Sequence, residues 1–173
     1  MTIQPLPTAY VLGQVSLAWR ELLWGYDHGW ISWDCLTEFA TRQLDSKNIN
    51  QMAEVELAGL LPIESYRARD LAEELAHNEP PMSEEAVREK WLYLILRWIF
   101  ENRERTVEPF AIVEALYADF GYPHEVARFV RYMPPGDEYD PREHSQPENE
   151  GHMLEQWRDY LIEAEKKFGL GQD

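Results

Sequence analysis

One stretch of the sequence restricts the fold more than any other. From Trp91 to Phe100 every residue except Arg97 is apolar or aromatic. One stripe on a surface helix cannot hold so many apolar side chains, so other segments of the chain should enclose this one. A run of this kind also suits a buried strand, and the run alone cannot decide between helix and strand. The residues on either side must decide.

The flanking residues favour a helix. Ser83 is a good N-cap, and the acidic residues that begin at Glu84 suit the positive end of a helix dipole. Arg103 and Arg105 suit the negative end. We therefore expect one buried helix over about 84–104, about 30 Å long at 1.5 Å per residue. Its apolar run is too short for a membrane span, which needs about 20 residues.

Helical periodicity recurs on both sides of this segment, separated by helix-breaking residues. The first periodic segment predicts a helix at about 17–28, after an extended arm at 5–7. The others are a helix capped by Ser32, two helices separated by Pro62, one that opens at Pro109, a short one after Pro123, and a last one with an apolar seam at Leu154, Trp157, Leu161, Ala164 and Phe168. No convincing strand is found. We expect an all-α fold of about eight helices, in a single domain over residues 1–173, packed around the central helix.

The segment at about 134–151 has no helical or strand periodicity, and it is rich in Pro, Gly and charge. A loop of this length is uncommon in a compact domain without a function. We expect an irregular acidic loop here.

The charge of the chain restricts its partners. Asp and Glu number 32 and Lys and Arg 16, so the formal net charge is -16. Nucleic acid and anionic membranes are themselves negative and are excluded as general partners, whereas a basic protein is the natural complement. The single Cys35 excludes an internal disulfide, and the first residues lack the features of a signal peptide. We expect a cytoplasmic protein.

Candidate chemistry is sparse. Cys35 falls in the first turn of a predicted helix, but no His pairing in the sequence supports a nucleophile, and packing explains it better. Glu73 and His77 have the i, i+4 spacing of metal ligands, yet a His in the last turn of a helix is explained by the dipole. No Gly-rich phosphate loop follows a strand. We expect no catalytic, cofactor-binding or metal-binding residues.

The acidic loop is the best candidate for binding. Its carboxylates would steer a basic protein and Tyr139 would anchor it. The predicted partner-binding residues are Asp137, Glu138, Tyr139, Asp140, Glu143, Glu148 and Glu150. A solvated connector is the alternative interpretation of this loop. A second acidic tract, from Glu54 to Glu85, is the next surface to consider.

Several short motifs carry a resemblance to a known family. They are VSLAW (15–19), WGYDHGW (24–30), WLYL (91–94), ENR (101–103), YADFGYP (117–123) and FVRYMP (129–134). Over most of residues 10 to 168 the chain resembles a bacterial family described only as a domain of unknown function. That family is similar in size and acidity to the immunity proteins that neutralise toxins in the cells producing them. The resemblance implies no active-site residue.

Three classes of function remain open. The first, and the one we favour, is a non-enzymatic inhibitor, similar to an immunity protein or antitoxin, that neutralises a basic bacterial toxin or effector through an acidic surface. The second is an enzyme whose site is assembled from separate helices, for which the residues to inspect are Asp27, His28, Asp119 and His124. The third is a structural adaptor with an exposed apolar patch around Trp30 and Trp33.

Overall fold

A computed structural model describes residues 3–46 and 50–170. Within these ranges the chain forms nine α-helices and three short 3-10 helices and no β-strand, which confirms the predicted all-α class. No helix in the described ranges has the length and apolar character needed to cross a membrane. The chain divides into two compact units, Met1–Val87 and Arg88–Asp173, and the border falls inside helix α6. The single domain expected over residues 1–173 stays a prediction.

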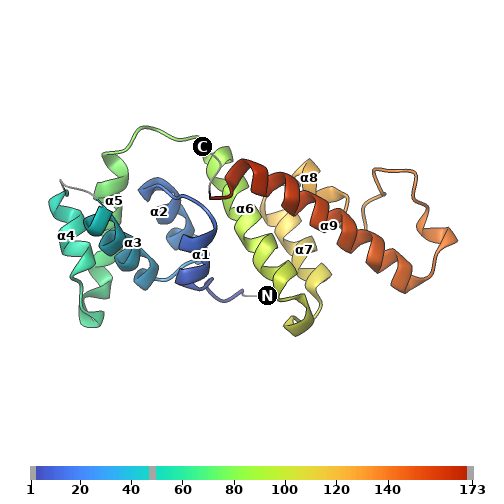
Figure 1. Cartoon of the computed structure of the whole chain (residues 1–173), viewed down its shortest axis with the longest axis horizontal. Helices are drawn as coiled ribbons and strands as arrows, with labels where there is room; N and C mark the ends of the chain where they lie inside the picture. The colour runs from blue at the N-terminus through green and yellow to red at the C-terminus, as the bar shows by residue number, and fades with distance from the viewer. Residues whose placement is uncertain (1–2, 47–49, 171–173) are drawn as a thin grey trace. The chain divides into compact units, whose positions relative to one another are not determined.

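Helices of the first unit surround α5. Its elements are α1 (Thr8–Gln14), α2 (Trp19–Asp27), α3 (Trp33–Ser46), α4 (Met52–Ala58), the 3-10 helix η1 (Pro62–Arg67) and α5 (Ala68–His77). Helix α5 packs against α2, α3 and α4, and α3 also packs against α4 (Figure 1). Apolar residues of α5 at 68, 71, 72, 75 and 76 repeat with helical spacing and are buried, so this helix forms the middle of the unit.

Helix α1 was not expected from the sequence. The extended arm at 5–7 is present, but a helix begins at Thr8, directly after Pro7. A helix of seven residues has too few positions for a periodic signal, and its Gly13 is a poor helix former. Burial supplies the missing stability, because Val11 is fully enclosed.

Helix α2 begins with a cap that is distant in sequence. Its N-cap residue, Ala18, has no side chain that accepts a hydrogen bond. The carboxylate of Glu79, which follows α5, accepts the backbone N–H groups of Trp19 and Arg20, both at 2.9 Å. The Arg20 guanidinium donates in return to the backbone carbonyl of Glu79 at 3.0 Å. Glu79 thus satisfies the first free amides of α2 and supplies negative charge at the positive end of its dipole.

Replacing Glu79 with alanine is expected to lower the free energy of unfolding by about 0.5 to 2 kcal/mol, the range for loss of a helix cap. Urea unfolding followed by circular dichroism would measure the change. The matched control is Glu74→Ala, because Glu74 is an exposed carboxylate of the neighbouring helix α5 and has no partner in the part of the chain described. If the two variants were equally stable, Glu79 would not act as a cap.

The second unit contains most of α6 (Glu84–Glu101) and η2 (Arg103–Arg105), α7 (Pro109–Asp119), α8 (His124–Ala127), η3 (Pro141–Glu143) and α9 (Gln146–Phe168). Its core is aromatic and centres on the indole of Trp157 in α9, which is fully buried. That ring stacks on Phe129 with centroids 5.6 Å apart, meets Phe100 of α6 edge-on at 5.2 Å, and lies 5.9 Å from Phe110 of α7. Side chains of α6 and α7 therefore meet Trp157 of α9 in one core, and Figure 1 shows these three helices beside one another.

The predicted burial of the central apolar run is confirmed. The buried residues of this run are Trp91, Leu92, Tyr93, Leu94, Ile95, Leu96 and Ile99. Helix α6 ends at Glu101, three residues before the predicted end at 104. The Asn102 side-chain amide donates to the Trp98 carbonyl, which also accepts the Asn102 backbone N–H. The Thr106 hydroxyl donates to the Asn102 carbonyl, whereas the Thr106 backbone N–H donates to the Arg103 carbonyl. Such side-chain bonds compete with a continuing α-helix, and the chain tightens into the 3-10 turn η2.

Candidate functional site

The predicted acidic loop is shorter than expected. The irregular backbone ends at Ser145, because α9 begins at Gln146 rather than after residue 151. The loop prediction was therefore wrong for Glu148 and Glu150, which lie in the first turns of α9. The physical reason is a capping box: the Ser145 hydroxyl accepts the Glu148 N–H at 3.3 Å, and the Glu148 carboxylate accepts the Ser145 N–H at 3.1 Å. We define the acidic segment as residues 137–150.

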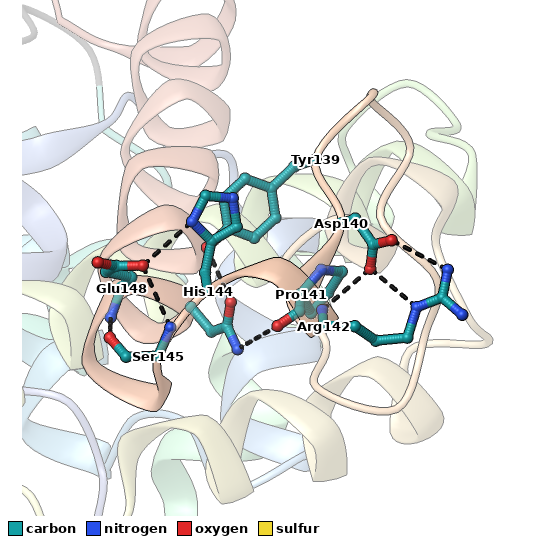
Figure 2. A network of polar contacts seen from close by, with 8 residues as sticks. Tyr139, Asp140, Pro141, Arg142, His144, Ser145 and Glu148 are labelled. Carbon is teal, nitrogen blue, oxygen red and sulfur yellow. Dashed lines mark hydrogen bonds and ion pairs between the residues drawn. The ribbon is translucent and has the colours of Figure 1, made fainter.

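Tyr139 is held inside the acidic segment by aromatic stacking. The ring of His144 lies 4.4 Å away and the ring of His152 lies 3.8 Å away, both nearly parallel to it. The Tyr139 hydroxyl donates to the side chain of Asn149 at 2.8 Å, and Asn149 donates to the Pro141 carbonyl at 3.1 Å. Figure 2 shows the Tyr139 and His144 rings together at the start of α9. The tyrosine predicted as an anchor for a partner is thus half-buried within its own segment.

Two of the predicted carboxylates fix the backbone around this stack. Asp137 accepts the Tyr139 N–H at 3.1 Å, and its other oxygen lies 3.0 Å from Nε2 of His152, an ion-pair distance without the angle of a hydrogen bond. Asp140 accepts three N–H groups of Arg142, from the backbone, Nε and Nη2, at 2.9 to 3.0 Å. These bonds from Arg142 lower the pKa of Asp140. Figure 2 shows this pair at the edge of the segment.

The remaining carboxylates divide into bound and unbound groups. Glu148 is bound twice, since it caps α9 and also lies 3.1 Å from Nδ1 of His144. Glu138 and Glu143 are exposed and have no partner among the described residues. Glu150 is exposed and its carboxylate has only a long contact of 3.5 Å, to the Gln146 amide. The segment therefore presents Glu138, Glu143 and Glu150 to solvent on a backbone fixed by the other predicted residues.

The other candidate residues have ordinary structural environments. Cys35 is fully enclosed, and burial raises the pKa of its thiol to about 12. Glu73 forms an ion pair with Arg69 at 2.9 Å, and His77 is exposed at the end of α5. Within residues 3–46 and 50–170, no three His, Cys, Asp or Glu side chains are grouped so that they could hold a metal ion.

The residues considered for an enzyme site lie at helix ends. Asp27 binds Arg69 through both of its oxygens, at 2.8 and 3.0 Å. His28 stacks on Trp24 at 3.8 Å. These residues belong to the first unit, whereas Asp119 and His124 belong to the second, at the end of α7 and the start of α8. The side chains of Asp119 and His124 are exposed.

The adaptor hypothesis pointed to Trp30 and Trp33, and both are half-buried. Sequence reasoning missed the more exposed apolar side chains, which follow one another along α4 and η1: Met52, Val55, Leu61, Ile63 and Tyr66. The signal was present in the sequence, because these residues lie off the buried helical face formed by Ala53, Leu57 and Leu60.

Fold and site together define an all-α protein with a structured acidic segment before its last helix. The chain belongs to a bacterial family, described as an uncharacterized protein conserved in bacteria (DUF2247), whose family model matches residues 9–166. The family resemblance inferred from the short motifs is thereby confirmed. Comparison with curated proteins and with solved structures gives no match.

Proposed function

We propose that this protein is a non-enzymatic binding protein, an inhibitor similar to an immunity protein or antitoxin, that neutralises a basic bacterial toxin or effector through its acidic surface. The proposal is supported by the excess of acidic residues and by the ion pairs that the basic residues already form. Acidic residues outnumber basic ones by 32 to 16. Many of the basic groups are bound to carboxylates of their own unit: Arg42, Arg67, Arg69, Arg97, Arg128, Arg131, Arg142 and Lys167.

Because these cations are already paired, exposed carboxylates such as Glu138 and Glu143 face solvent with no basic partner among the described residues. A surface of this kind attracts a basic protein over long distances and accelerates its association. The acidic segment adds a second advantage, since its bonds hold Glu138 and Glu143 on a fixed backbone. A preorganised segment loses little conformational entropy on binding.

The test is a kinetic measurement whose probe is the protein encoded by the adjacent gene, because immunity proteins are encoded beside the toxins that they neutralise. The variant replaces Glu138, Glu143 and Glu150 with glutamine. We expect its on-rate to fall by roughly tenfold at low salt, because steering by these charges is lost, and the difference from the parent to vanish near 1 M salt, where the Debye length is about 3 Å.

The matched control replaces Glu104, Glu125 and Glu155 with glutamine. These carboxylates are also exposed and without partners in the described ranges, so the control changes the net charge equally. A loss of on-rate that is equal in both variants would contradict a role for the acidic segment. Failure of the parent protein to bind or inhibit the adjacent gene product would contradict the proposed function itself.

A further inference from the structure

Helix α4 and η1 expose an unusual set of large apolar side chains. The exposed fractions are 72% for Met52, 48% for Val55, 60% for Leu61, 83% for Ile63 and 78% for Tyr66. Single exposed apolar residues are common on protein surfaces and need no explanation. Five within one short stretch of the first unit are different, because apolar side chains that gather on a surface mark interaction sites. We name this set the α4–η1 face.

The α4–η1 face continues into an acidic stripe on α5. Arg67 and Ala68 both have right-handed helical backbone, so η1 leads into α5 without a break. Residues 63, 66, 70 and 74 are then spaced by three and four positions, which places them along one side of the helical path. Asp70 and Glu74 are exposed and have no partner in the part of the chain that the structure describes. This side of the helical path is therefore apolar at residues 63 and 66 and acidic at residues 70 and 74.

The cation of this region is neutralised within the unit. Arg67 donates to the Glu56 carboxylate of α4 at 2.8 Å, and its other nitrogen lies 3.7 Å from Glu64. The first contact joins η1 to α4. Arg67 is thus paired with two carboxylates of its own unit. An acidic partner would therefore meet only repulsion from Asp70 and Glu74.

These observations define the occupant. We propose that the α4–η1 face is the docking surface for a cationic protein segment, whose apolar side chains cover Ile63 and Tyr66 and whose Lys or Arg side chains meet Asp70 and Glu74. Tyrosine is enriched among the residues that dominate binding energy. A second copy of this chain is opposed by a net charge of -16 on each molecule. The inference rests on the proposed function, because the occupant is the same basic protein.

The experiment uses the full-length protein and the purified product of the adjacent gene. We expect Ile63→Ser with Tyr66→Ala to weaken binding by roughly 30-fold or more, mainly through the off-rate and at both low and high salt. Asp70→Asn with Glu74→Gln should instead lower the on-rate, and only at low salt. The matched control is Val107→Ser with Tyr132→Ala, since these residues of the second unit are 84% and 59% exposed. It should change affinity by less than about threefold.

Each outcome separates the inference from the proposed function. If the parent binds the probe and the α4–η1 variant binds as the control does, the docking surface is wrong and the proposed function stands. If the parent does not bind the probe, the proposed function and the docking surface are both contradicted. If sedimentation shows a dimer of the parent that the Ile63 and Tyr66 changes dissolve, the occupant is a second copy and the inference is overturned. Circular dichroism should show that the variants keep the fold, because the replaced side chains are exposed.

Discussion

Replacing Trp157 with alanine is expected to destabilise the second unit by about 3 to 5 kcal/mol, the range for removing a buried aromatic side chain. The indole is fully buried and its neighbours come from three other parts of the unit: Phe100, Phe110 and Phe129. Its removal leaves a cavity that these rings cannot fill without leaving their own positions. The indole N–H has no acceptor among the described residues, so the loss is one of packing rather than of a hydrogen bond.

Hydrogen exchange of the α9 amides would measure this effect, because it reports on the second unit even if the two units unfold separately. Trp157→Phe should cost less than alanine, since it keeps an aromatic ring and has no polar group to leave unpaired. The control is Ile162→Ala on the same helix, where the side chain is 47% exposed. Equal losses of protection in the alanine variants at 157 and 162 would show that Trp157 is not the centre of this core.

Cys35 in the folded protein is expected to react with thiol reagents about a thousandfold more slowly than in the unfolded chain, because only the thiolate reacts. Burial raises the pKa of its thiol from the ordinary 9.0 to about 12, and the adjacent carboxylate of Asp34 adds to the rise. Near pH 8 the thiolate fraction falls about tenfold for each whole number by which the pKa rises, which gives the expected ratio. Enclosure of the side chain slows the reaction further.

Labelling with a coloured disulfide reagent, with and without urea, would measure this ratio. The raised pKa of Cys35 also determines how the stability of the fold changes with pH. Because the folded protein keeps the thiol proton longer than the unfolded chain, the stability that this group contributes is full below pH 9 and declines as pH rises toward 12. Cys35→Ala should remove that part of the decline. Rapid labelling of the native protein would show an accessible thiol and renew the case for a nucleophile.

The sequence predicted the fold where a local pattern was strong. The run from Trp91 to Phe100 has too many apolar side chains for one stripe on a surface helix. Most of these side chains are buried, and the run is helical as expected. The start of α9 was missed although its signal was local, because Pro147 and Gly151 interrupt the periodicity that follows Ser145. The cap on α2 could not be predicted from a local pattern, because Glu79 is distant in sequence from the helix that it caps. No rule of residue spacing relates the two.

The candidate site shows the same limit. Composition identified Glu138 and Glu143 as exposed acidic residues, and the structure places both in solvent. It did not predict that Tyr139 would stack with His144 and His152, because that arrangement depends on where α9 begins. Once the capping box is recognised, His152 falls on the second turn of the helix, and a contact with the preceding loop becomes an expectation.

The cap on α2 also has a consequence for biosynthesis. The Glu79 carboxylate lies 60 residues after the amide of Trp19 that it binds. A ribosome that adds about 5 to 20 residues per second needs about 3 to 12 s to make that stretch. During this interval the first backbone N–H groups of the nascent α2 lack their cap. The apolar face around Leu22 also lacks α5, the helix against which α2 packs in the folded unit. The first unit can therefore be completed only after most of its own sequence has been translated.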